Sequence, residues 1–112
     1  MRLSNKDLQS FYKIINKRFY NNALPADIVV RFDDADEMED HDEGEYIEAD
    51  KQILIHKDFR RHPDVAMMVL VHETAHVALP EYVGWTDKDE HGHRFEALIG
   101  ELYRKGAYDG LL

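Results

Sequence analysis

The sequence contains no cysteine and no long hydrophobic run. Without cysteine there is no disulfide and no cysteine-ligated metal, so a zinc site would have to use His, Asp or Glu. The same absence makes an intracellular, cytoplasmic location the default expectation. No apolar stretch approaches the roughly 18 to 20 residues that span a bilayer. The opening MRLSNKDLQSFYK has no apolar signal-peptide core, so we expect neither a membrane protein nor a secreted one.

The composition is that of a globular protein. The chain has 112 residues, of which 44% are hydrophobic and 33% charged. This length is typical of one domain with a modest core, and the balance of residue types differs from that of disordered or membrane proteins. We therefore expect a single domain over residues 1–112 and a monomer.

The whole formal excess of negative charge lies in one segment. The formal net charge is −9, and residues 33–45, DDADEMEDHDEGE, hold nine acidic residues and no basic one. Of the 23 Asp and Glu residues, 14 remain to balance the 14 Lys and Arg residues. The charge therefore indicates neither a generally acidic surface nor a strongly basic nucleic-acid-binding face. We expect 33–45 to be a solvated, mobile acidic loop, and no register in it fits an EF-hand calcium loop.

Hydrophobic periodicity and turn residues predict six elements. The first helix begins at Ser4 and Asp7, which resemble a capping box, and has an apolar face at i, i+3, i+4 and i+7 spacing. The second helix, which follows the three strands, is apolar nearly all round, as in a buried helix, and Pro80 should stop it. Gly106 should stop the last helix, and ADK (49–51) is a hairpin turn between two strands. The order is helix, three short strands, buried helix, loop and helix, which is typical of a small α+β domain. The predicted helices span 4–20, 63–79 and 92–105, and the predicted strands span 27–33, 45–49 and 52–56.

The buried helix carries three polar residues in the stretch LVHETAHV. His72 and His76 are four apart and share one helix face, so their imidazoles can meet one ion. Glu73 is rotated by about 100° and can reach a water on that ion. This H-E-x-x-H pattern predicts two zinc ligands, His72 and His76, and a general base, Glu73. The alternative is a pair of hydrogen-bonded core histidines, although burying these groups without partners is costly.

A catalytic zinc site needs a third protein ligand. Downstream, DEHGHRFEALIG offers His91, His93 and, less favourably, Glu96. His91 precedes a helix and is followed by Gly92, whose backbone freedom helps the chain turn toward the metal. The residues alone favour His91 but leave His93 open.

These motifs together resemble a known family. LVHETAHV is similar to the metal-binding helix of the SprT-like zinc metallopeptidases, which include the Spartan-type proteases of DNA–protein crosslinks. HGHRF (91–95) resembles the H-G-x-x-F/W element of that family, and FYKIINKRFYNNALPADIVVRF and ILIHKDF resemble its opening helix and strands. The resemblance implies a zincin-like fold, a Zn²⁺ cofactor with His91 as third ligand, and hydrolysis of a protein or peptide substrate.

The resemblance leaves alternatives open. Many family members carry a cysteine-based zinc ribbon or a DNA-binding tail, and this sequence has no cysteine. The resemblance thus implies a nucleic-acid partner, but the charge distribution of the chain does not support one. Only scattered basic residues are available, such as Lys57, Arg60 and Arg61. The competing hypotheses are a DNA-associated protease and an inactive, zinc-stabilised protein-binding module.

Overall fold

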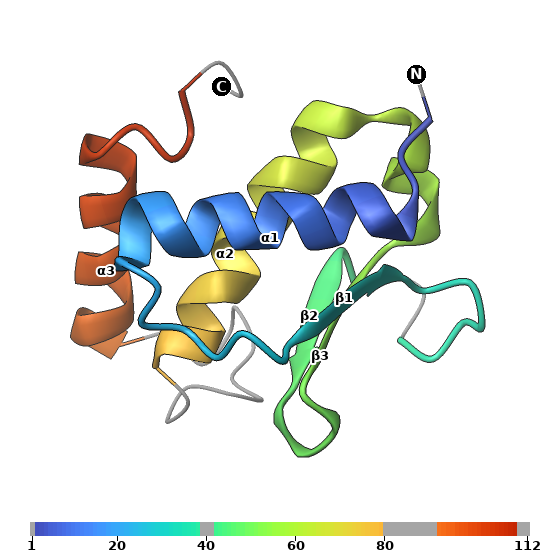
Figure 1. Ribbon diagram of the computed structural model, residues 1–112, viewed down its shortest axis with the longest axis horizontal. Coiled ribbons are helices and arrows are strands. Elements are labelled where there is room, and N and C mark those ends of the chain that lie inside the picture. Colours follow the sequence, from blue (N-terminus) through green and yellow to red (C-terminus); the bar gives the residue numbers. More distant parts are fainter. Residues whose placement is uncertain (1, 39–41, 80–91, 110–112) are drawn as a thin grey trace.

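The computed structural model describes residues 2–38, 42–79 and 92–109 (Figure 1). These residues form three α-helices and a three-stranded mixed sheet, which confirms the predicted α+β class. In chain order the elements are α1 (Asn5–Tyr20), β1 (Val29–Phe32), β2 (Gly44–Ile47), the 3-10 helix η1 (Glu48–Asp50), β3 (Gln52–Ile55), the 3-10 helix η2 (Lys57–Arg61), α2 (Pro63–Ala78) and α3 (Gly92–Arg104).

Helix α1 begins at a capping box, as the sequence predicts. The Asp7 N–H donates to Ser4 Oγ at 3.1 Å, and the Ser4 N–H donates to Asp7 Oδ2 at 2.8 Å. The two bonds satisfy donors that the first helical turn leaves without a partner. The Ser4 backbone and side-chain hydrogen bonds also lower the pKa of Asp7. The helix ends at Asn21, whose φ of 52° is left-handed.

Strand β3 lies at the centre of the sheet, with β1 on one side and β2 on the other. β1 runs parallel to β3, and β2 runs antiparallel to it. The turn between β2 and β3 is the one the sequence predicts at residues 49–51, and it takes the form of η1 followed by a left-handed Lys51. Both β1 and β2 are therefore edge strands.

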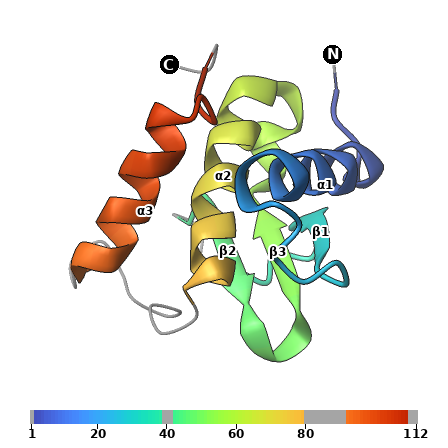
Figure 2. The ribbon, with the colours of Figure 1, turned by 60° about the vertical axis from the view of Figure 1, so that its left-hand side comes forward.

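Helix α2 is the central element of the domain. It contacts α1, the strands β2 and β3, and α3, and Figure 2 shows it between α3 and the sheet. Its side chains at Ala66, Leu70, Val71 and Ala75 are completely buried. A helix that is apolar on every face is most stable when each face is removed from water. The prediction of a buried helix is confirmed.

The remaining helix ends agree with the sequence to within a residue or two. Pro63 is the first residue of α2, where its missing N–H costs nothing. α2 ends at Ala78, and Pro80, which was expected to stop it, lies outside the described residues. The chain leaves α3 through Gly106, whose φ of +91° suits glycine as a helix stop.

The acidic segment is only partly the solvated loop that we expected. Residues 34–37 are exposed, but Asp33 and Met38 are buried, with 5% and 7% of their surfaces exposed. The Asp33 carboxylate accepts the N–H groups of Glu37 and Met38 at 2.8 and 2.9 Å. A carboxylate that caps its own turn can be buried because its charge is hydrogen-bonded, so the expectation was wrong at these two positions. Residues 39–41 lie outside the described part.

Within residues 34–37, ion pairs hold the exposed carboxylates to the rest of the fold. The pairs are Asp34–Arg60, Asp36–Lys57 and Arg31–Glu37. Their basic partners come from β1 and η2, so residues 34–37 follow the surface rather than extend away from it. The sequence gives no sign of this pairing, since the partners are up to 26 positions apart.

Candidate metal centre

The described structure brings His72, Glu73 and His76 together on α2. Each side chain offers one ligand atom, and these atoms all lie within 4.8 Å of one another. Glu73 and His76 are buried, with 6% and 7% of their surfaces exposed, and His72 is half-buried. Two imidazoles and a carboxylate are donors that suit zinc and similar divalent ions. The group could therefore hold a metal ion.

The burial of this group is set by the helix on which it lies. Positions 72, 73 and 76 cover less than one and a half turns, and their neighbours Leu70, Val71 and Ala75 are completely buried. The Nδ1 atom of His76 is itself shielded from solvent. Polar side chains in such surroundings need a specific function or partner to offset their desolvation. Each of the three side chains has such a partner, and a bound cation, which the donor set suits, would add to it.

Phe95 of α3 packs against both imidazole rings. Its ring centroid lies 5.3 Å from that of His72 and 4.6 Å from that of His76, while the two imidazoles are 5.2 Å apart. Phe95 is 2% exposed, so it is fixed in the core between α2 and α3. Such edge and tilted ring contacts restrict the orientation of the imidazoles. The sequence placed Phe95 on an apolar helix face and in the HGHRF element, but it did not show this contact.

Thr74, directly after Glu73, connects α2 to α1. Its hydroxyl donates to the Val71 carbonyl at 2.6 Å and lies 3.0 Å from the Tyr20 hydroxyl. Burial raises the pKa of Tyr20 to about 12, so its hydroxyl is neutral at ordinary pH. The contact helps to fix the register of α2 at the polar group. Nothing in the sequence pairs residues 20 and 74.

The three candidates for a third ligand fall in, or directly before, α3 in the sequence. His91 lies outside the described residues, and for the competing His93 the structure describes only the backbone, in the first turn of α3. Glu96, the weaker candidate, is exposed on α3. Lys57, Arg60 and Arg61, the scattered basic residues, lie together on η2, immediately before α2.

Comparison of the chain with family models, curated proteins and solved structures found no match. The resemblance to the SprT-like metallopeptidases therefore stays a prediction from the motifs. Within residues 2–38, 42–79 and 92–109, no helix combines the length and apolar character that a membrane span requires.

Proposed function

We propose that this chain is a zinc-dependent metalloendopeptidase with a SprT-like, zincin-like domain. The observation that supports the proposal is the group formed by His72, Glu73 and His76, whose ligand atoms lie within 4.8 Å of one another on a buried helix. In this proposal His72 and His76 bind the metal through neutral imidazole nitrogens. His91 is the third ligand, as the resemblance implies.

Glu73 is the general base in this proposal. Bound zinc would lower the pKa of a coordinated water and polarise the scissile carbonyl. A carboxylate oxygen of Glu73 accepts the proton of the attacking water and later donates it to the leaving amine. The position of Glu73 supports this role, because its carboxylate lies within 4.8 Å of the ligand atoms of His72 and His76 and can reach a water on the same ion.

The two sheet edges are not equivalent as places for an extended substrate. The Gln9 side chain bonds to the Ile28 carbonyl at 2.8 Å and accepts the Val30 N–H at 3.0 Å, and Asn5 accepts the Phe32 N–H at 2.8 Å. Side chains of α1 thus already use the backbone groups along the outer edge of β1.

The other edge strand, β2, adjoins the candidate metal centre. Its first residue, Gly44, packs against Val69 and Glu73 of α2. Peptides commonly bind enzymes by adding a strand to a sheet edge. We therefore place the substrate along β2, where its backbone would pass the general base.

The test is Glu73→Gln, measured with an unfolded protein substrate and with zinc analysis. The variant should keep its zinc and lose at least about 100-fold in turnover, since general bases contribute on that order. Glu101→Gln is the matched control, because Glu101 is exposed and pairs only with Lys105 on α3 among the described residues. Undiminished proteolysis by a clean Glu73→Gln preparation would rule out the mechanism.

The alternatives give different results in the same assay. A zinc-stabilised binding module would bind zinc and unfold more easily after chelation, but would cleave nothing in either form. A DNA-associated protease would be stimulated by single-stranded DNA at low salt, and stimulation would fade as salt is added.

A further inference from the structure

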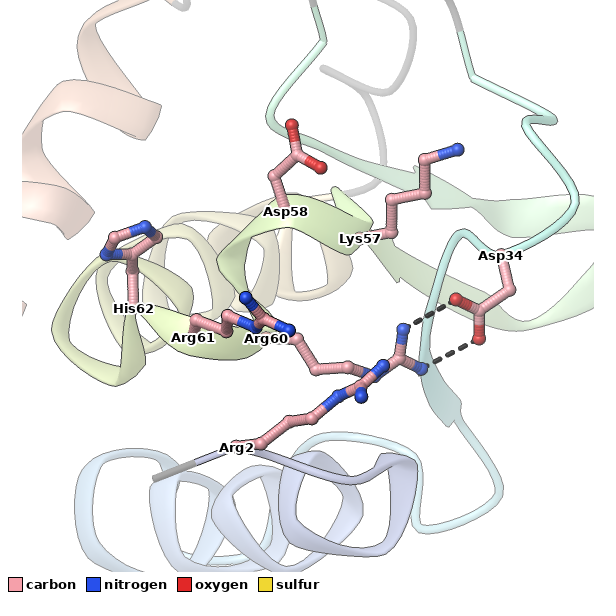
Figure 3. Close-up of a pocket in the computed structure, with 7 residues that line it drawn as sticks. All are labelled: Arg2, Asp34, Lys57, Asp58, Arg60, Arg61 and His62. Atoms are coloured by element: carbon pink, nitrogen blue, oxygen red, sulfur yellow. Dashed lines mark hydrogen bonds and ion pairs between the residues drawn. The ribbon is translucent and has the colours of Figure 1, made fainter.

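A hollow of about 560 Å³ lies on the surface beside η2 (Figure 3). η2 precedes the N-terminus of α2, whereas the candidate metal centre lies in the C-terminal half of that helix. The hollow is formed where the N-terminal residues, η2 and the acidic segment meet. Most of its lining side chains are basic. They are Arg2, Lys57, Arg60 and Arg61, with His62 and the carboxylates of Asp34 and Asp58.

Backbone and ring contacts position two of these residues, the Arg2 main chain and the Arg60 side chain. The Leu3 N–H donates to the Arg60 carbonyl at 2.8 Å, and Leu3 is 2% exposed, so Arg2 is held next to η2. The Arg60 guanidinium lies over the Phe32 ring, 4.5 Å from its centroid. A guanidinium stacked on an aromatic ring loses little further freedom when it binds a ligand.

The Asp34 carboxylate is an oxyanion of this chain that lies in the hollow. Its two carboxylate oxygens accept from the two terminal nitrogens of Arg60 at 2.6 and 2.7 Å. This is the paired geometry with which arginine binds carboxylates and phosphates. Arg60, together with the nearby charges of Lys57 and Arg2, lowers the pKa of Asp34. Several positive charges therefore act on a single oxyanion.

The basic charge of the hollow exceeds what Asp34 and Asp58 neutralise. Four basic side chains and two carboxylates give the lining a formal charge of +2 with His62 neutral, in a chain of net charge −9. Lys57 also pairs with Asp36 at 2.7 Å, but both groups are exposed and such pairs are easily displaced. Within the described residues, Arg2 and Arg61 have no ion pair or side-chain hydrogen bond.

We propose that this hollow binds the phosphate oxygens of a di- or triphosphate group, with Arg2 and Arg61 as its main ligands beside the Arg60–Asp34 pair. Guanidinium groups match phosphate oxygens in pairs. A polyvalent anion is favoured over a single carboxylate, because four basic residues line the hollow and its volume of about 560 Å³ exceeds that of one small ion. The site is independent of the candidate metal centre.

The test is calorimetric titration of the full chain with inorganic pyrophosphate at low ionic strength. The double variant Arg2→Gln/Arg61→Gln should bind about tenfold more weakly or worse, as expected for lost charge-assisted hydrogen bonds. Arg18→Gln is the matched control, since Arg18 is exposed near the opposite end of α1 (Figure 1). Any extraction of zinc by pyrophosphate would be common to all variants, so only the arginine dependence is scored.

A second variant changes binding in the opposite direction. Asp34→Asn removes a negative charge from the hollow and frees Arg60, so pyrophosphate should bind several-fold more tightly. Titration with acetate should give no saturation in the same range. The proposal is overturned by an absence of saturable pyrophosphate binding, by equal losses in Arg18→Gln and the double variant, or by weaker binding in Asp34→Asn.

Discussion

Gly44 lies directly against Glu73: a Cβ built at position 44 would stand 3.3 Å from Glu73 Cγ. The same Cβ would stand 2.5 Å from Val69 Cγ1 and 3.2 Å from the Leu54 carbonyl oxygen. A real Cβ atom does not approach another side-chain atom as closely as the 2.5 Å separation from Val69 Cγ1. The missing side chain therefore allows β2 to approach α2 at the residue that we propose as the general base.

Gly44→Ala should destabilise the domain. The added methyl group forces either the stiff Val69 side chain or β2 itself to move, and such overpacking costs about 1 to 3 kcal/mol. Because Glu73 is part of the same contact, proteolysis should fall by more than the loss of folded protein explains. Urea denaturation and single-turnover cleavage measure the two effects separately.

Gly100→Ala is the matched control for that change. Gly100 lies inside α3, where a Cβ would meet, among the described residues outside the helix backbone, only the Arg104 guanidinium, at an ordinary 3.5 Å. Replacing a helical glycine by alanine stabilises by about 0.5 to 1 kcal/mol. If both alanine variants are equally stable, the close contact at Gly44 is not restrictive.

Metal analysis of His91→Ala and His93→Ala tests the third ligand. For protein purified without a metal-affinity tag, we expect about one zinc per chain in the wild type, following the three-ligand form of catalytic zinc sites. Zinc should be lost in His91→Ala and kept in His93→Ala. The reverse pattern would identify His93 as the third ligand. A wild-type protein that stays metal-free after zinc is added back would refute the metal centre.

Phe95→Leu should weaken zinc binding without unfolding the protein. Leucine keeps an apolar side chain between α2 and α3 but removes the ring that packs against His72 and His76. Freer imidazoles lose more entropy on binding, so affinity should fall roughly 10- to 100-fold, as when supporting contacts around metal ligands are removed. Competition with a chromophoric chelator measures the zinc affinity of each variant. Phe11→Leu, on the half-buried face of α1, should leave zinc affinity unchanged.

The Asp34–Arg60 pair should make stability depend on acid pH. Arg60 lowers the pKa of Asp34 in the folded state below its unfolded value of about 3.9. The unfolded chain therefore takes up this proton first as pH falls. The stabilisation is complete above about pH 5 and disappears as pH falls through the folded-state pKa. A carboxyl-detected NMR titration should give a low Asp34 pKa in the wild type and an ordinary one in Arg60→Gln.

The sequence predicted those features that depend on near neighbours in the chain. Helix α1 follows from Ser4, Asp7 and the 3.6-residue apolar period, and burial of α2 follows from its apolar residues on every face. The placement of His72, Glu73 and His76 on one short stretch of helix is likewise local, because helix geometry alone fixes their spacing.

The sequence could not predict contacts between residues that are far apart in the chain. Phe95 against His76, Thr74 beside Tyr20, and Asp34 on Arg60 join residues 19 to 54 positions apart. Each depends on how helices and strands pack, and a sequence pattern describes one element at a time. The acidic segment was misjudged for a different reason: its composition indicates solvation, whereas the buried Asp33 carboxylate accepts the N–H groups of Glu37 and Met38 in a local turn.

By itself, then, the sequence determined the class of the fold, the helix that carries the polar group and the kind of ligand available, because these follow from local periodicity and from the absence of cysteine. Only the tertiary structure decided that α1 side chains use the edge of β1, that Gly44 brings β2 onto Glu73, and that Arg2, Arg60 and Arg61 meet in one hollow. Those relationships are set by packing between elements, whose free energy depends on the shape of the surfaces in contact.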